Sequence, residues 1–296
     1  MVCLEGEVPP DACRGLRPTE IERGGFLACQ HRPTGDMRVA LPDDPNARVA
    51  AVLTGKEVLG PNVCRLTLRP AAPFAYRAGQ FLNLRRRDGL VRSYSLASLP
   101  ERDETLEIHV KRLPGGALSG WLCETVEAGE TLEIEGPYGD CLYAAEQPEQ
   151  PLLLIGTGTG LAPLLGVLRD ALARGHRGPI RLYHGSRRAS GLYCDAALRA
   201  LAAAHPSLSY QPCVSGDDPP EGFRPQRADL AAFEDQGELA GWRVYLCGYP
   251  AMVESARRTA FLHGACLSAI HADPFDLRDL RSAPRPEAGP PKPDTW

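Results

Sequence analysis

The sequence contains no run of basic residues and no segment in which basic and aromatic residues alternate, and its formal net charge is only −4. These absences argue against a nucleic-acid-binding protein and against attraction to an anionic membrane surface. Residues 1–7 lack both the cationic flank and the apolar stretch of a signal peptide. We therefore predict a cytoplasmic protein.

Cysteine is abundant, but closely spaced pairs are missing. The ten cysteines lie at positions 3, 13, 29, 64, 123, 141, 194, 213, 247 and 266, without a single CxxC pair. Because a metal site usually starts from such a short-range pair, we expect no complete metal site. In a cytoplasmic chain of this size, most of these residues are expected to be reduced thiols.

Residues 151–168 carry no charge, and this stretch is nearly as long as a membrane-spanning helix. Its centre, however, reads Gly156-Thr157-Gly158-Thr159-Gly160, and these glycines would destabilise a helix exposed to lipid. We predict a strand, a loop and a helix in a soluble domain, and no membrane span.

The first half of the chain divides into two parts. Residues 1–45 are rich in Gly, Pro and charge and end in a linker-like sequence. Residues 46–148 contain short alternating segments separated by Gly and Pro, which is typical of a small antiparallel β-barrel. The predicted strands are 48–54, 63–69, 81–84, 91–96, 105–111 and 131–135.

In residues 149–275, apolar strands alternate with helices, which predicts an α/β domain with a parallel sheet. The predicted strands are 152–155, 180–184, 208–214, 243–247 and 266–271. The predicted helices are 161–174, 192–204, 228–235 and 250–263. Residues 281–296 hold five prolines and no apolar periodicity, so we predict a disordered tail over 276–296.

The strongest local signal is the step from the buried strand 152–155 into Gly156-Thr157-Gly158-Thr159-Gly160 and a helix with Pro163 in its first turn. Glycines let the backbone approach a pyrophosphate, and the helix start offers free N–H groups and the positive end of its dipole. The pattern is GxGxG and not the full GxGxxG, and a purely structural turn is the alternative. In this βα context we favour a dinucleotide site.

A second candidate is Arg92-Ser93-Tyr94-Ser95, on a predicted barrel strand. Alternation places Arg92 and Tyr94 on one face and Ser93 and Ser95 on the other. A cation and an aromatic ring at this spacing suit a phosphate and a flat ring system. Taken alone, these residues are better interpreted as an ordinary exposed strand.

Other motifs occur with this one in a fixed order: His109-Val110-Lys111-Arg112, Gly115-Gly116-Ala117-Leu118-Ser119, Gly136-Pro137-Tyr138-Gly139, the loop 156–163 and Leu246-Cys247-Gly248-Tyr249-Pro250. The set resembles the ferredoxin–NADP reductase family, in particular the reductase components of bacterial oxygenases. The resemblance covers about residues 46–275 and implies an FAD-binding barrel followed by an NAD(P)-binding domain.

The resemblance implies roles for the matching barrel residues. Arg92 would contact a flavin phosphate, Tyr94 would stack on the isoalloxazine, and Ser95 would hydrogen-bond near N5, where hydride arrives. The remaining FAD contacts would come from His109, Val110, Gly115, Gly116 and Ser119. The last three would hold a pyrophosphate, which favours FAD over FMN. Gly136, Pro137 and Gly139 would form the turn between the two domains.

In the second domain, Cys247 and Gly248 would lie beside the nicotinamide, at the carboxyl end of a parallel strand. Ser95 and Cys247 are thus the expected catalytic residues, with a buried structural thiol as the alternative for Cys247. Phe275 is a candidate ring near the flavin, and a plain core aromatic is an equal alternative.

The choice between NADH and NADPH depends on two loops. Ser186 and Arg187 follow the second parallel strand, where cations suit a 2′-phosphate or form a solvated turn. NADP-preferring relatives carry Ser-Arg after the third strand, whereas this sequence has Ser215-Gly216-Asp217-Asp218. Because carboxylates repel a phosphate dianion, NADH is mildly favoured.

Residues 20–39 resemble the second half of a plant-type [2Fe–2S] ferredoxin domain, and Cys29 matches its fourth cluster ligand. Residues 4–8 resemble the strand after the cluster loop. Three cysteines at C-x4-C-x2-C spacing should precede that strand, and Met1 comes too late to include them. We expect no [2Fe–2S] cluster in this chain. A truncated start is slightly preferred over a repurposed remnant.

The predicted function is that of an NAD(P)H-dependent flavoprotein reductase. Hydride would pass from NAD(P)H to FAD, and single electrons would then pass to an iron–sulfur or haem partner, as in an oxygenase system. Three alternatives stay open: a diaphorase-like reductase of small acceptors, a flavin-binding electron-transfer subunit without enzymatic use of nicotinamide, and a degenerate chain without flavin.

Overall fold

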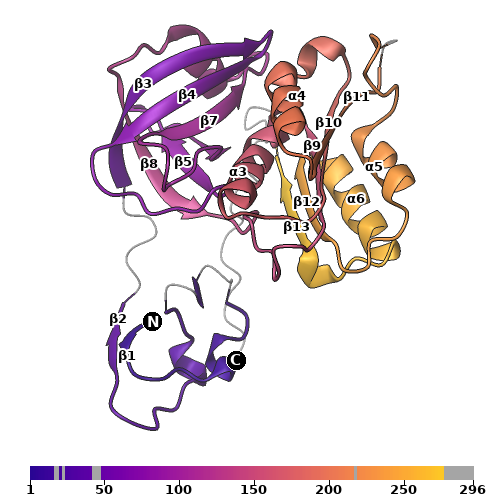
Figure 1. Cartoon of the computed structure of the whole chain (residues 1–296). Helices are drawn as coiled ribbons and strands as arrows, with labels where there is room; N and C mark the ends of the chain where they lie inside the picture. Colours follow the sequence, from indigo (N-terminus) through magenta and orange to yellow (C-terminus); the bar gives the residue numbers. More distant parts are fainter. Residues whose placement is uncertain (17–19, 22–23, 42–47, 217–218, 277–296) are drawn as a thin grey trace, which may run out of the picture.

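The computed structural model describes residues 1–16, 20–21, 24–41, 48–216 and 219–276, in three parts (Figure 1). The N-terminal lobe pairs β1 (Val2–Glu5) with β2 (Arg38–Ala40) in an antiparallel sheet. It also holds two short 3-10 turns, η1 (Pro10–Cys13) and η2 (Ala28–Gln30). In Figure 1 this lobe lies apart from the two larger domains. The predicted boundary at residue 45 falls outside the described residues.

The first large domain is an antiparallel six-stranded sheet in the order β6-β5-β8-β3-β4-β7. Its strands are β3 (Arg48–Gly60), β4 (Val63–Pro70), β5 (Phe81–Arg85), β6 (Val91–Ser95), β7 (Leu106–Lys111) and β8 (Thr131–Tyr138). A bridge between Leu96 and Ile108 joins the two edge strands, which closes the sheet as predicted. Alternate positions along the strands, such as Leu66 and Leu68, fill the interior.

Two short helical segments lie between β7 and β8: α2 (Ala117–Gly120) and the π-helical turn η3 (Trp121–Thr125). Cys123 in this turn forms a disulfide with Cys64 in β4. The spacing of the cysteines did not predict this bridge. The other eight cysteines are free.

The second large domain is a parallel five-stranded sheet in the order β11-β10-β9-β12-β13. Its strands are β9 (Leu152–Thr157), β10 (Ile180–Ser186), β11 (Leu208–Val214), β12 (Arg243–Gly248) and β13 (Ile270–Pro274). Its helices are α3 (Leu161–Ala173), α4 (Asp195–Ala204), α5 (Ala228–Gln236) and α6 (Pro250–Leu262). From β9 the chain adds β10 and β11 on one side of the sheet and then β12 and β13 on the other. A ligand crevice is therefore expected at the carboxyl end of β9, where the strand order changes direction.

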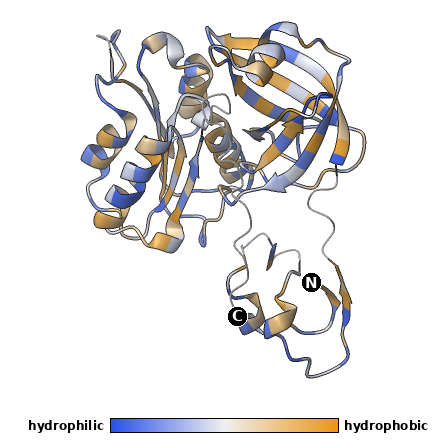
Figure 2. Ribbon diagram, turned by 180° about the vertical axis from the view of Figure 1, so that it is seen from behind, coloured by the Kyte–Doolittle hydropathy of each residue, from blue (hydrophilic) through white to orange (hydrophobic). Residues whose placement is uncertain are grey.

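Helices cover both faces of this sheet. Leu153 and Ile155 of β9 pack with residues of α5 and α6, whereas Leu152 and Leu154 pack with residues of α3 and α4. Because both faces of β9 are covered, its sequence is continuously apolar. Figure 2 shows the central strands as mainly hydrophobic, with hydrophilic positions on the outer faces of the helices.

Several predicted boundaries need correction. The last strand was predicted over 266–271, but Leu267–Ala269 form the 3-10 turn η6 and β13 runs from Ile270 to Pro274. Helix α4 begins at Asp195 and not at Leu192, because Cys194 adopts a left-handed φ of 60°. Strand β3 continues beyond 54 to Gly60. Within the described residues, no helix is long and apolar enough to cross a membrane. The predicted tail lies outside the described residues after Asp276.

Helix α3 holds the two large domains together. A side-chain carbon at Gly166 would collide with the backbone of Gly79 and Leu96, so the helix touches the barrel directly at this glycine. One turn further on, Arg169 donates hydrogen bonds to the carbonyl of Ala97 and to the carboxylate of Asp103. The relative position of the glycine loop 156–160 and the barrel is therefore set by α3, the helix that starts at this loop.

Candidate active site between the two large domains

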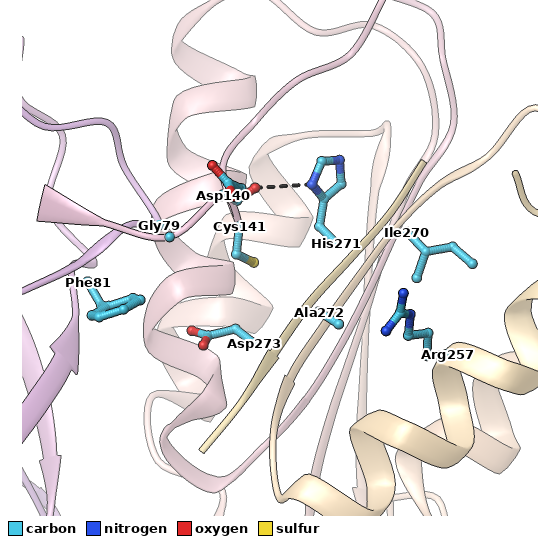
Figure 3. Close-up of a pocket in the computed structure, with 10 residues that line it drawn as sticks. Gly79, Phe81, Asp140, Cys141, Arg257, Ile270, His271, Ala272 and Asp273 are labelled. Atoms are coloured by element: carbon cyan, nitrogen blue, oxygen red, sulfur yellow. Dashed lines mark hydrogen bonds between the residues drawn. The ribbon is translucent and has the colours of Figure 1, made fainter. Parts of the chain in front are cut away.

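Two segments far apart in the sequence meet where the barrel faces the α/β domain. Ser95, at the end of β6, donates a hydrogen bond from Oγ to Oδ2 of Asp273 in β13, over 3.3 Å. Beside them is a cavity of about 390 Å³ whose lining includes Phe81 from β5 and Asp273 itself (Figure 3). Because β6 and β13 belong to different domains, this hydrogen bond forms only when the domains are in contact.

The Asp273 carboxyl has an unusual acidity. Burial disfavours its ionised form and raises its pKa to about 6, while the hydrogen bond from Ser95 acts in the opposite direction. Asp273 therefore changes charge near neutral pH, where an ordinary aspartate is fully ionised. Shifted carboxyls of this kind are frequent where chemistry takes place.

The glycine loop after β9 packs tightly on the end of β12. Gly158 has a φ of 55°, which favours glycine, and a side-chain carbon at Gly160 would collide with the Cys247 carbonyl group. Thr157 Oγ1 accepts a hydrogen bond of 2.9 Å from the backbone N–H of Tyr249. The other predicted loop residues, Gly156, Thr159 and Pro163, are buried. The loop and the strand end thus form one backbone surface at the carboxyl edge of the sheet.

Cys247, Gly248 and Phe275 come together beside that surface. The backbone N–H of Phe275 donates a hydrogen bond of 2.8 Å to the Gly248 carbonyl, so this aromatic residue lies directly next to the end of β12. The Cys247 thiol is fully buried, and burial raises its pKa well above the ordinary value. It is therefore protonated at neutral pH, so a reaction of this sulfur requires transfer of its proton.

Arg92 and Tyr94 lie on the strand that carries Ser95. Arg92 is exposed, and its guanidinium donates a hydrogen bond of 2.7 Å to the carbonyl of the neighbouring Val91. Tyr94 is half-buried against the barrel core, and burial raises the pKa of its hydroxyl. The register pairs Arg92 with Leu84 and Tyr94 with Leu82, so the cation and the ring share one face.

His109 takes part in a buried chain of polar groups that joins the two domains. Its Nε2 lies 2.9 Å from Glu107 Oε1, and its Nδ1 lies 3.1 Å from Tyr193 Oη. The Tyr193 ring packs edge to face on His184, whose Nε2 is 3.2 Å from the carbonyl oxygen of Gly158. We call Glu107, His109, Tyr193 and His184 the histidine chain. It connects barrel strand β7 with the glycine loop.

This arrangement limits how His109 and Val110 contact a flavin. The His109 side chain is turned toward Tyr193, and Val110 is fully buried in the barrel core. Any contact of these two residues with FAD is therefore expected through their backbone. The resemblance alone did not distinguish backbone from side-chain contact.

His184 provides a first test of the loop geometry. A carbonyl oxygen only accepts, so Nε2 of His184 carries the proton, and burial lowers the pKa of His184 to about 4, which keeps the ring neutral above pH 5. His184→Leu removes the donor from Gly158, and we expect the KM for the nicotinamide nucleotide to rise about tenfold with little change in kcat.

The matched control is His184→Gln, whose amide N–H reaches a similar position and should restore most of the affinity. Steady-state kinetics over a wide range of nucleotide concentration measure both variants. Equal KM values for the Leu and Gln variants would show that the hydrogen bond to Gly158 does not position the loop.

The segment Gly115–Gly116 leads into α2, as expected for a turn that holds a pyrophosphate. Gly115 has a φ of 66°, and a side-chain carbon at Gly116 would collide with the Ser119 hydroxyl. Ser119 Oγ accepts a hydrogen bond of 3.2 Å from the backbone N–H of Leu113. Only glycine leaves this turn open, so the residues present fit a bound diphosphate.

Ser186 is the last residue of β10, and Arg187 follows it at the carboxyl edge of the parallel sheet. The backbone N–H of Ser215 donates to the Ser186 carbonyl and that of Gly216 to the Arg187 carbonyl, each over 3.0 Å. The loops after β10 and β11 are thereby joined. Asp217 and Asp218, on which the predicted choice of nucleotide depends, lie outside the described residues.

Sequence reasoning missed three features of this site. Asp273 was passed over in favour of Phe275, although a single acid before Pro-Phe at the end of a strand was a usable signal. The contact of Tyr193 with two histidines had no local signal, because its members come from different domains. The same is true of Cys141, whose Sγ lies 3.3 Å from Cys247 Sγ.

A closed β-barrel and a parallel sheet with a glycine loop at its carboxyl edge, joined by Ser95 and Asp273, define a flavin- and nicotinamide-dependent oxidoreductase. Comparison with known families agrees. Residues 50–143 match the oxidoreductase FAD-binding domain, and residues 154–258 match the oxidoreductase NAD-binding domain. The chain belongs to the ferredoxin–NAD(P)+ reductase-type flavoprotein enzymes.

Its relatives include reductase components of oxygenase systems. The chain is 33% identical to the ferredoxin–NAD(P)+ reductase component of the naphthalene 1,2-dioxygenase system of Pseudomonas putida, over 92% of this chain and 88% of the relative. It is 36% identical to the reductase subunit of an aromatic O-demethylase from Amycolatopsis, over 92% and 85%. A solved cytochrome P450 reductase from Amycolatopsis superposes with a TM-score of 0.72 at 35% identity, covering 93% of this chain and 86% of that one.

The ferredoxin-like interpretation of the N-terminal lobe stays a prediction. Cys29 is exposed, and Cys3 and Cys13 are partly exposed. Among the residues that the structure describes, no group of three or more His, Cys, Asp or Glu is arranged to hold a metal ion. The expected absence of a [2Fe–2S] cluster also stays a prediction.

Proposed function

We propose that the chain transfers hydride from NADH to FAD and passes the electrons singly to an iron–sulfur or haem protein of an oxygenase system. The hydrogen bond between Ser95 and Asp273 carries this proposal. It joins β6, the barrel strand that carries the Arg92–Ser95 motif, to β13. Strand β13 leads into Phe275, which is hydrogen-bonded to Gly248 at the carboxyl edge of the parallel sheet. A flavin held by the barrel and a nicotinamide held by the α/β domain would meet at this junction.

The residues of the barrel would bind the flavin. Arg92 is free to pair with a phosphate, Tyr94 offers a ring face beside it, and Gly115, Gly116 and Ser119 leave room for a pyrophosphate. Bound FAD supplies the ability to accept a hydride and release electrons one at a time. The chain itself supplies orientation and exclusion of water, which is the main contribution of the protein in such transfers.

The α/β domain would bind and orient the nucleotide. The glycine loop and the start of α3 hold the pyrophosphate, and Gly248 and Phe275 border the nicotinamide. Asp273, when ionised, stabilises the positive charge that the nicotinamide ring gains as hydride leaves. The Cys247 thiol packs beneath this site.

Anaerobic mixing of the FAD-loaded protein with NADH or NADPH tests the proposal. We expect the flavin absorbance to bleach, and reoxidation to follow on addition of a small iron–sulfur protein. Bleaching without transfer to iron–sulfur or haem proteins, but with transfer to small dyes, would support a diaphorase-like reductase. No bleaching with either nucleotide would contradict the proposal and support a flavin-binding electron-transfer subunit. A purified protein that binds no flavin would contradict both.

Iron–sulfur and haem acceptors are favoured by the relatives. The naphthalene dioxygenase relative is named as a ferredoxin reductase component, and the Amycolatopsis structure as a cytochrome P450 reductase. Both partner types receive electrons one at a time. A flavin suits them as a donor, because it accepts two electrons together as hydride and can release them singly.

The preference for NADH makes a separate prediction. If Asp217 and Asp218 repel a 2′-phosphate, changing both to Asn should raise kcat/KM for NADPH about tenfold and leave kcat/KM for NADH nearly unchanged. Arg187→Gln is the opposite control, because loss of an exposed cation should lower the use of NADPH only. If the ratio of kcat/KM for NADPH to kcat/KM for NADH is the same in the Asn variant as in the parent, the predicted preference for NADH has no basis in these two residues.

A further inference from the structure

Two buried thiols touch each other beside the proposed hydride-transfer site. Cys141 lies in the segment that joins barrel strand β8 to β9, and Cys247 lies at the end of β12. Their sulfur atoms are 3.3 Å apart. Neither thiol accepts hydride or binds a phosphate in the mechanism above, so their contact needs another explanation.

We propose that Cys141 and Cys247 are a reversible redox pair, which hydrogen peroxide oxidises to a disulfide that stops hydride transfer. The proposal rests on the proposed function for its readout, the reduction of the flavin by NADH. The thiol pair itself is independent of that function, because bond formation is measurable by mass.

The geometry is close to what a disulfide requires. The sulfur atoms of a disulfide are about 2.05 Å apart, so the two atoms must approach by about 1.2 Å. Both backbones are held in place: the Cys141 carbonyl fills the space beside Gly79, and the Cys247 carbonyl fills the space beside Gly160. We therefore expect closure of the bond to displace at least one of these tightly packed segments.

A small displacement at Cys247 reaches the nucleotide site directly. The next residue, Gly248, packs on the backbone and hydroxyl of Thr157 in the glycine loop, and its carbonyl binds the N–H of Phe275. A misplacement of about 1 Å where two reactants must be aligned costs about 100-fold in rate. The disulfide is expected to act on this scale.

Access of an oxidant is unequal for the two thiols. Cys141 lines the cavity that also contains Asp273, and 5% of its surface is exposed, whereas Cys247 is completely buried (Figure 3). Peroxide entering the cavity therefore meets Cys141 first. Cys247 stands behind it, at contact distance, as the second thiol of the pair.

The chemistry then follows in two balanced steps. The Cys141 sulfur attacks one peroxide oxygen, the O–O bond breaks, and one water leaves with Cys141 as a sulfenic acid. The Cys247 sulfur next attacks the Cys141 sulfur, the S–O bond breaks, and a second water leaves with the Cys247 proton. Two thiols and one hydrogen peroxide give one disulfide and two waters. Flavins that lose electrons to dioxygen are a source of this oxidant.

The test uses the FAD-loaded protein. It is exposed to hydrogen peroxide without nucleotide, freed of peroxide, and mixed anaerobically with NADH, and the rate of flavin bleaching is compared with that before exposure. We expect a loss of about 100-fold. Dithiothreitol should reverse it, and peptide mapping should show a new link between the peptides containing Cys141 and Cys247. The Cys64–Cys123 bridge serves as the internal reference in the map.

Two variants, Cys141→Ser and Cys266→Ser, go through the same treatment. For each variant, the rate of flavin bleaching after peroxide is compared with its own rate before peroxide. Cys266 is exposed, and its hydrogen bond from Ser268 lowers its pKa, so it is the natural rival target of peroxide. The Cys141 variant should keep its rate after peroxide, and the Cys266 variant should lose it as the parent does.

Equal losses in the parent and the Cys141 variant, absence of the 141–247 link, or a linked protein that still bleaches at the original rate would overturn the proposal. A protein that never bleaches before peroxide would instead contradict the proposed function. In that case the mass measurement alone still decides whether the thiol pair forms.

Discussion

Replacement of Asp273 by Asn is expected to slow flavin reduction by NADH about 100-fold, with little change in the KM for NADH. The carboxylate lies at the junction of the two domains, hydrogen-bonded to Ser95. In the proposed function the nicotinamide ring would become positive at this point as hydride leaves. An amide of the same shape keeps the packing and loses the charge. Stopped-flow bleaching at saturating NADH measures the effect. Asp276→Asn is the matched control, because Asp276 is exposed three positions away.

The same carboxyl sets a pH dependence. Because burial raises the pKa of Asp273 to about 6, the rate should rise as pH increases through 6 and level off above it, as the ionised form accumulates. Ser95→Ala removes the hydrogen bond that lowers this pKa, so the rise should move to higher pH. The Asn variant should show a flat profile. A parent profile that is flat between pH 5 and 8 would contradict the role of Asp273.

Gly160→Ala is the second change with a large expected effect. The added carbon would collide with the backbone of Cys247 and Gly248, which has no flexible end that can move aside. Because Gly160 has an ordinary helical φ of −59°, the effect comes from space and not from backbone strain. We expect binding of NADH to weaken at least about 100-fold, together with a loss of stability of about 1–3 kcal/mol from overpacking.

Gly120→Ala is the matched control for this change. Gly120 also has a helical φ, of −63°, but the nearest atom to an added carbon is the end of the Glu124 side chain at 3.9 Å. This variant should bind NADH and unfold as the parent does. Nucleotide titration and thermal unfolding measure both variants. Normal NADH affinity in the Gly160 variant would show that the loop and β12 are not a single binding surface.

The fold was largely predictable because its periodicities are local. Apolar and polar residues alternate in β4 because only one face of this strand is covered. Strand β9 is continuously apolar because both of its faces are covered. Boundaries were missed where a single residue departs from the pattern, as at Cys194 with its left-handed φ. The start of β13 was missed because Leu267–Ala269 are apolar enough to resemble a strand but form a 3-10 turn.

The site was predictable only in part. Glycine and aromatic motifs can be recognised in the sequence because a phosphate or a ring favours those residue types at short spacing, as predicted for the loop at Gly156–Gly160. Asp273, Cys141 and the histidine chain depend on contacts between residues that lie far apart in the sequence, up to 178 positions for Ser95 and Asp273. Such contacts follow from the docking of α3 on the barrel, which no local pattern encodes.

The most direct measurement of the central claim is the rate of flavin bleaching in a single anaerobic turnover, with NADH carrying hydrogen or deuterium at the transferred C4 position. Direct transfer between two stacked rings predicts clearly slower bleaching with deuterium in the FAD-loaded protein. Equal bleaching rates with hydrogen-labelled and deuterium-labelled NADH, or no bleaching with either form, would contradict hydride transfer at the junction of Ser95, Asp273 and Gly248.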